Sequence, residues 1–174
     1  MKKLLLTTAI LAATSVPSFA GSLDSDYQYF TAKVVSSNYD IDGVDVDRAA
    51  GFNLTVGRHL TDSNVSVEAG YSDLGESTAR AFGLSADVSA TTLFANAKFD
   101  YKIKDNFSAY TKLGLNRVSL EVSSGSFSET ESEMKLMYGA GAQFTLTPEV
   151  SLVTDYVVYA ADISALSMGV AIQF

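Results

Sequence analysis

The sequence contains no cysteine and no tryptophan, and it has one histidine and two prolines in 174 residues. Without cysteine, the chain cannot form a disulfide, a thiolate metal site or the lipid anchor of a lipoprotein. Basic residues are also scarce: 12 stand against 20 acidic ones, for a formal net charge of −8. Such a chain has no electrostatic basis for binding nucleic acid. No cofactor or metal centre is predicted.

Residues 1–20 are predicted to form a secretory signal peptide. Lys2 and Lys3 give a basic start, an apolar stretch follows, and a small-x-small cleavage signal ends at Ala20. The apolar stretch is too short for a membrane-spanning helix, although an uncleaved anchor is the alternative. Cleavage would leave one domain, residues 21–174, with a still larger acidic excess because both leader lysines are lost.

Long hydrophobic runs are missing from residues 21–174, where no window approaches the ~18 consecutive apolar residues of a transmembrane helix. Hydrophobic residues alternate with small or polar ones instead. At the end of the chain, Met168, Val170, Ile172 and Phe174 fall on one face, since successive side chains of a strand point to opposite sides. The closing strand of a membrane barrel has this pattern, with its last aromatic at the interface.

Eight segments with this alternation are predicted to be strands. Short turns between them alternate with three long polar connections, at 37–47, 75–88 and 121–132. Bacterial outer-membrane barrels combine short periplasmic turns with longer outer loops in the same way. The predicted fold is all-β, an eight-stranded antiparallel up-and-down transmembrane β-barrel in the outer membrane. The strands are expected at 26–36, 48–59, 64–74, 89–103, 106–120, 133–146, 149–159 and 163–174.

The apolar face of these strands carries no charge through its middle, as contact with lipid requires. Its aromatic residues fall into two groups, which we interpret as belts at the two membrane interfaces. A soluble, lipocalin-like barrel is the alternative, but its apolar face would point inward and would not band its aromatics. The expected periplasmic belt contains Phe30, Tyr101, Phe107, Phe144 and Phe174, and the outer belt contains Phe52, Tyr71, Tyr138 and Tyr156.

The opposite face carries six charged residues, which are predicted to point into the lumen. Lys98 and Lys112 lie almost opposite each other across a tight turn and would repel. They therefore require carboxylates nearby, and an eight-stranded barrel is narrow enough for side chains to fill it. We predict an ion-pair cluster that plugs the lumen, with inward-facing glycines leaving room for the long side chains. The cluster comprises Lys33, Glu68, Lys98, Asp100, Lys112 and Asp155.

Four stretches, in order along the chain, resemble the OmpA-type family of eight-stranded outer-membrane barrels. In that family, the residues matching Glu68, Lys98, Lys112 and Asp155 form a salt-bridge gate, so the resemblance implies the same cluster. The family's C-terminal peptidoglycan-binding domain is not expected in this chain. The matching stretches are VEAGYSDLG (67–75), ANAKFDYKIKDNFSAYTKLG (95–114), AGAQFTLTPEVSLVTDY (140–156) and LSMGVAIQF (166–174).

These features favour a structural and surface-interaction role over catalysis. The expected partners are membrane lipids and lipopolysaccharide, the barrel-assembly machinery through the C-terminal strand, and a host or surface ligand through the three long connections. A narrow, gated pore is the alternative. A lipid-modifying enzyme is less favoured because the only histidine, His59, has no serine beside it in the sequence. Asp40-x-Asp42-Gly43 is an incomplete calcium loop and is interpreted as solvated.

Overall fold

The computed structural model describes residues 27–40, 45–46, 48–60, 63–81, 84–124 and 127–174. The predicted signal peptide, residues 1–20, lies outside the described residues, as do Asp42 and Gly43 of the acidic stretch. No helix in the described ranges is long and apolar enough to cross a membrane.

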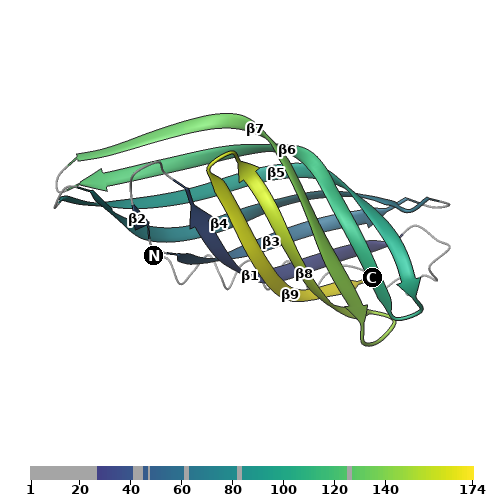
Figure 1. Cartoon of the computed structure of the whole chain (residues 1–174). Coiled ribbons are helices and arrows are strands. Elements are labelled where there is room, and N and C mark those ends of the chain that lie inside the picture. Colours follow the sequence, from purple (N-terminus) through teal and green to yellow (C-terminus); the bar gives the residue numbers. More distant parts are fainter. Residues whose placement is uncertain (1–26, 41–44, 47, 61–62, 82–83, 125–126) are drawn as a thin grey trace.

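The described chain is built of antiparallel strands that close into a barrel (Figure 1). Neighbours in sequence pair with each other around the wall, β4 pairs with β5, and β1 pairs with β9 to complete the ring. The two-residue β2 pairs only with β4 and is an addition to the eight wall strands. The strands are β1 (Gln28–Tyr39), β2 (Asp45–Val46), β3 (Ala49–His59), β4 (Val65–Ala81), β5 (Leu84–Lys104), β6 (Phe107–Ser124), β7 (Phe127–Thr145), β8 (Val150–Ala160) and β9 (Ile163–Gln173).

The barrel has two distinct ends. The short connections β3–β4, β5–β6 and β7–β8 lie at one end, which we call the turn end. The first and last strands also meet there: the Gln28 amide donates to the Phe174 carbonyl at 3.1 Å, and the Phe174 amide donates to the Gln28 carbonyl at 2.9 Å. The opposite end, the hairpin end, carries the β4–β5, β6–β7 and β8–β9 hairpins. Backbone closure at both edges satisfies the polar groups that a membrane-spanning sheet cannot leave exposed.

The eight predicted strands are confirmed, but two of the predicted long connections are wrong. Residues 75–88 and 121–132 belong mostly to strands, because β4 pairs with β5 out to Ala81 and Leu84, and β6 pairs with β7 out to Ser124 and Phe127. These four strands extend well beyond the β8–β9 hairpin (Figure 1). In β4 and β7, residues 76–78 and 128–133 put polar side chains on both faces, so the apolar alternation that marks a strand is missing there although the backbone pairing continues. In β5 the alternation is present, since Leu84, Ala86 and Val88 alternate with polar residues.

One irregularity shapes the wall at the base of the extension. The β4–β5 register shifts between Asp73 and Glu76, which places one extra residue in β4. Gly75 adopts φ 85°, a left-handed conformation that glycine reaches without steric cost. The bulge leaves Leu74 fully buried, and the Tyr39 hydroxyl donates to the Gly75 carbonyl at 3.0 Å. The bulge therefore turns Leu74 into the interior.

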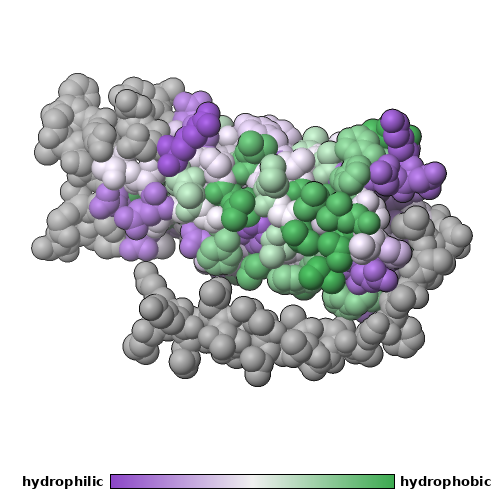
Figure 2. Space-filling model, turned by 90° about the horizontal axis from the view of Figure 1, so that it is seen from below, coloured by the Kyte–Doolittle hydropathy of each residue, from purple (hydrophilic) through white to green (hydrophobic). Residues whose placement is uncertain are grey.

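The predicted outward face is confirmed by its exposure. Leu93 is 61% exposed and Leu113 51%, whereas Lys98 and Lys112, on the other face, are each 6% exposed. Figure 2 shows apolar residues gathered over the middle of the described surface, with hydrophilic residues nearer its two ends. The sheet therefore presents its apolar side chains outward, which is the reverse of a soluble barrel.

All nine predicted interface aromatics lie on this outward side or at its ends. Tyr101, Tyr138, Tyr156, Phe144 and Phe52 are exposed, and the others are partly exposed. Two contacts support the predicted grouping. Phe107 pairs directly with Phe144 near the turn end, and the rings of Phe52 and Tyr71 lie 6.0 Å apart nearer the hairpin end.

Candidate functional site in the barrel interior

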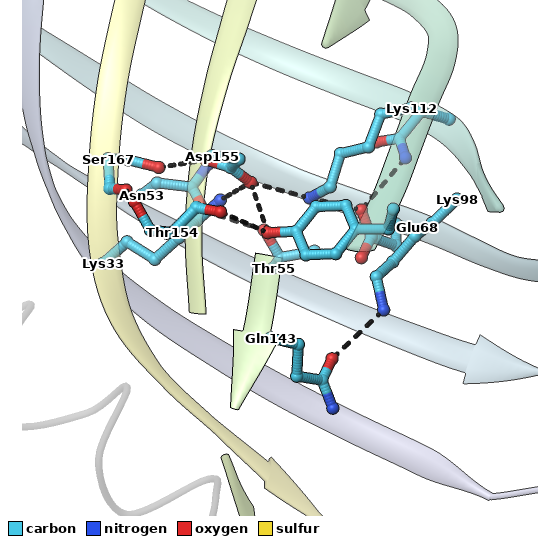
Figure 3. A network of polar contacts seen from close by, with 12 residues as sticks. Lys33, Asn53, Thr55, Glu68, Lys98, Lys112, Gln143, Thr154, Asp155 and Ser167 are labelled. Atoms are coloured by element: carbon cyan, nitrogen blue, oxygen red, sulfur yellow. Dashed lines mark hydrogen bonds and ion pairs between the residues drawn. The ribbon is translucent and has the colours of Figure 1, made fainter. Parts of the chain in front are cut away.

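Four charged side chains from four strands meet in the lumen (Figure 3). Asp155 Oδ2 on β8 lies 2.8 Å from Lys33 Nζ on β1 and 3.2 Å from Lys112 Nζ on β6. Lys112 Nζ also lies 2.9 Å from Glu68 Oε2 on β4. All four side chains are at most 6% exposed. We call these residues the charged layer; its two cations and two anions balance, as buried charges must.

Lys98 and Asp100 stand apart from the charged layer. Lys98 pairs directly with Lys112 across β5 and β6, as the sequence predicted. We expected Glu68 and Asp155 to serve both lysines, but Lys98 Nζ instead lies 2.6 Å from Asp100 Oδ1 and donates to Gln143 Oε1 at 3.3 Å. Asp100 is two residues further along the same strand and therefore on the same face. The Lys98 side chain thus points toward the turn end, whereas the Lys112 side chain points into the charged layer.

Aromatic and amide side chains complete the charged layer, and sequence reasoning missed them. Tyr29 donates its hydroxyl to Glu68 Oε1 at 2.7 Å, and Asn96 donates to Glu68 Oε2 at 3.0 Å. Tyr110 donates to Asp155 Oδ2 at 3.1 Å, and Ser167 donates to the other oxygen of Asp155. Their inward parity was readable from the sequence. Each carboxylate is therefore satisfied by neutral donors as well as by lysine, which offsets part of the desolvation cost.

Glycines leave space for the two tyrosines. A Cβ on Gly141 would lie 2.5 Å from the Tyr110 ring, and a Cβ on Gly57 would lie 2.2 Å from the Tyr29 ring. The sequence predicted that inward glycines would make room for lysines, but at these two positions the ring is the close neighbour. The Tyr110 ring in turn lies under both lysines, with Lys98 Nζ 4.7 Å and Lys112 Nζ 5.3 Å from its centroid, distances typical of cation–π contacts.

Between the charged layer and the hairpin end, buried hydrophobic side chains form a cluster that was not expected from the sequence. Uncharged polar side chains are buried among them: Ser37, Asn53, Ser72, Thr92 and Asn116. The β8–β9 hairpin contributes Ala160 and Ile163, which lie at the hairpin end of the cluster. We call it the apolar plug; it comprises Val35, Tyr39, Ala49, Leu74, Ala90, Phe94, Val118, Met137, Val157, Tyr159, Ala160, Ile163 and Ala165.

A polar cavity of about 360 Å³ opens at the turn end. Its walls include Tyr27, Asp100, Lys102 and Gln143, so it reaches the partners of Lys98. Beyond them, a smaller pocket of about 10 Å³ lies among Lys33, Glu68 and Lys112 of the charged layer. A buried water needs at least ~10–15 Å³ of such volume. The cavity is therefore a vestibule that ends at the charged layer.

His59 has a serine neighbour that the sequence argument overlooked. His59 pairs with Ser66 across the β3–β4 connection, and His59 Nδ1 lies 3.2 Å from Ser66 Oγ. The imidazole also stacks on Tyr27 with ring centroids 4.8 Å apart. Ser66 is 1% exposed and is not part of the vestibule wall. No serine flanks His59 in the sequence, but cross-strand pairing brings Ser66, seven positions away, into contact with it.

Comparison with solved structures identifies outer-membrane barrels with this fold. Ail of Yersinia pestis, in complex with the heparin analogue sucrose octasulfate, has a TM-score of 0.55 at 20% identity, over 86% of this chain and 97% of that one. Neisserial surface protein A has a TM-score of 0.59 at 17% identity, over 86% and 97%. OprG of Pseudomonas aeruginosa has a TM-score of 0.62 at 15% identity, over 90% and 99%.

At such identities the likeness shows the fold alone. A search of curated proteins found no match. The family comparison is more specific, because residues 6–174 match the family described as outer membrane protein beta-barrel domain. With its closed eight-stranded wall and its apolar outer face, this chain belongs to the outer membrane protein beta-barrel domain family and is a protein of the outer membrane.

Proposed function

We propose that this protein is a small structural and surface-interaction barrel whose lumen is plugged. The turn end faces the periplasm, and the extension of β4–β7 projects outside the cell, as in bacterial barrels generally. The observation that carries the proposal is the filled interior. The pocket found among the charged-layer side chains measures about 10 Å³, and the buried apolar plug lies between it and the hairpin end. A continuous aqueous path would have to displace both.

The proposed partners follow from the same surfaces. The exposed outward side chains contact membrane lipid and, in the outer leaflet, lipopolysaccharide. The C-terminal strand, β9, is proposed to engage the barrel-assembly machinery before it pairs with β1. Residues 1–20 are proposed to be removed as a signal peptide. The outer ends of β4–β7, within 75–88 and 121–132, together with 37–47, are proposed to contact a ligand outside the cell.

The ligand class is proposed to differ from that of Ail, which has been crystallised with a heparin analogue. In the extension of this chain, Glu131 and Glu133 are exposed and would repel a polysulfated sugar. A basic ligand is therefore proposed. No enzymatic role is proposed, because Ser66 is buried away from the vestibule and a nucleophile must reach its substrate.

A narrow, gated pore is the second candidate, and the vestibule supports it. The cavity already gives water access as far as Asp100 and Gln143, so opening would require rearrangement of the charged layer and the apolar plug only. Conduction through such a path would be small and intermittent.

Planar-bilayer recording separates the two candidates. The plugged barrel should show no steady conductance, and Glu68→Ala should raise current only if the charged layer is the sole barrier. The proposal would be overturned by a steady, large conductance of the unmodified protein. The surface role is tested separately. Vesicles that carry the protein should bind a surface coated with a basic protein, and replacing residues 77–88 and 120–131 by short turns should abolish that binding.

A further inference from the structure

The outer half of β7 has one neighbour instead of two. β7 pairs with β6 along its whole length, from Phe127 opposite Ser124 to Phe144 opposite Phe107. It pairs with β8 only from Tyr138 to Thr145. Among the described residues, no strand pairs with residues 127–137 on the side away from β6. We call this side of residues 127–137 the free edge; Figure 1 shows it running beyond the β8–β9 hairpin.

The free edge is long enough to accept a whole strand. At ~3.3 Å per residue it extends for ~35 Å, which is longer than a typical strand in a globular protein. Every second residue of an edge strand directs its amide and carbonyl outward, so the edge presents a row of unpaired backbone groups. Such rows bind extended polypeptide by adding it to the sheet as a further strand.

The side chains along the free edge are charged on one face. Glu131, Glu133 and Lys135 share the face of Met137, because strand side chains alternate with period two. Glu133 lies opposite Val118 and Glu131 opposite Leu120 on β6, so this face continues upward from the apolar plug. The three charged side chains are exposed because the opposite wall of the barrel has already ended. Lys135 forms an ion pair with Glu133.

This pattern selects the occupant. A second copy of the chain, paired edge to edge, offers one cation, Lys135, against two glutamates. Centred on Ser132, the pairing would set Glu131 opposite Glu133, which is destabilising. Centred on Met134, it would leave Glu131 opposite Met137 without a cation. A strand with lysine or arginine at alternate positions would instead place its cations beside Glu131 and Glu133. Inward-pointing charge on an edge strand also opposes aggregation. An acidic or uncharged strand added to this edge would leave the glutamates without a cation, whereas a basic strand would supply one.

We propose that the free edge of β7 binds an extended, basic polypeptide segment of an extracellular partner as an antiparallel strand. Backbone hydrogen bonds to residues 127–137 supply the attachment, and the glutamates supply the preference for basic sequences. The proposal rests on the surface-interaction role, since it places the free edge outside the cell, and it specifies the partner for that role.

The test uses the full-length protein in lipid bilayer discs and a synthetic peptide of about ten residues that alternates lysine and threonine, to match the edge. A second peptide has the same sequence but is N-methylated at alternate residues, which removes the donors of one edge and keeps the charge. Binding is measured by fluorescence anisotropy. The lysine peptide should bind, and N-methylation should weaken it by about tenfold or more.

Charge reversal provides the second arm. The double variant Glu131→Lys/Glu133→Lys should lose the lysine peptide and gain binding of the matching glutamate peptide. The control Asp105→Lys/Glu149→Lys makes the same change in net charge at exposed positions of the turn end and should bind the lysine peptide as the unmodified protein does.

Equal binding of the two lysine peptides would overturn strand addition, because it would leave only electrostatic attraction. Unchanged binding by the double variant would overturn the assignment to this edge. If the lysine peptide does not bind while vesicles still attach to a basic surface, the surface role stands and the free-edge proposal falls. If the peptide binds while vesicle attachment fails, the free edge accepts a basic strand, but the surface-interaction role falls and the assignment of the partner to the outside of the cell falls with it.

Discussion

The two halves of the lumen are filled by opposite chemistry. Near the turn end, the charged layer pairs two lysines with two carboxylates and surrounds them with tyrosine, amide and hydroxyl donors. Near the hairpin end, the apolar plug packs hydrophobic side chains together with buried uncharged polar ones such as Asn53 and Asn116. The first half depends on every charged partner being present, whereas the second depends mainly on packed volume, with hydrogen bonds at its two tyrosines, Tyr39 and Tyr159.

The difference indicates how each half contributes. A buried ion pair gives little net stability, because desolvation offsets most of the Coulomb energy, yet removing one partner is costly. Apolar burial contributes stability in proportion to area and tolerates replacement by side chains of similar volume. We therefore expect the charged layer to specify one arrangement of strands and the apolar plug to supply most of the interior stability. Substitutions in each half can separate these contributions.

The largest effect is expected for Asp155→Ala. Both Lys33 and Lys112 contact Asp155 Oδ2, so its removal leaves one lysine without a carboxylate and the other with Glu68 only. The free energy of unfolding should fall by about 3–5 kcal/mol, measured by urea titration in lipid vesicles. Asp105→Ala, which removes an exposed partner of Lys102, is the matched control and should leave the midpoint unchanged. A loss no larger than that of the control would mean that the charged layer is dispensable.

Leu74→Ala tests the other half. Leu74 is fully buried in the apolar plug, and its truncation should cost about 3 kcal/mol, within the range of leucine truncations in packed cores. Leu74→Met, which conserves volume, should cost less than about 1.5 kcal/mol. If both substitutions proved equally destabilising, the position beside Gly75 would require leucine itself. The plug would then depend on particular side chains, as the charged layer does.

The smallest effect is expected for Lys98→Ala. Lys98 is paired with Asp100, whose side chain is 20% exposed and lines the vestibule, so water can replace part of the lost interaction. The loss in unfolding free energy should be about 1 kcal/mol. A heat-modifiability assay in detergent should show the folded band persisting close to the unmodified protein's melting temperature. A loss as large as that of Asp155→Ala would place Lys98 within the charged layer.

Alternation with period two was sufficient to predict the fold, the outward face and the inward charges, because it follows directly from strand geometry. It failed for the hairpin ends at 75–88 and 121–132. In residues 128–133, serine, threonine and glutamate occupy both faces, and nothing in that pattern distinguishes a solvated strand from a loop. In residues 84–88 the alternation of Leu84, Ala86 and Val88 with polar residues did indicate a strand, but it was not used. The free edge of β7 was consequently invisible in the sequence.

The partners within the site were predicted less well. The parity of Tyr29 and Tyr110 placed them inward, but aromatic residues were expected only at the interfaces. The Lys98–Asp100 contact was available from their i, i+2 spacing, and the His59–Ser66 contact from the pairing across one turn. The choice of Lys112 over Lys98 by the two carboxylates depends on side-chain reach across the lumen, which spacing along the chain does not give.

The central claim is that the apolar face meets lipid while the opposite face lines the lumen, and adjacent residues at one depth can test it. The chain has no tryptophan, so Phe144→Trp and Gln143→Trp would each introduce a single fluorophore, the first on the exposed outer face and the second beside the vestibule. In vesicles of brominated phospholipid, Phe144→Trp should be strongly quenched and Gln143→Trp only weakly. Strong quenching at position 143 with little at 144 would contradict the account.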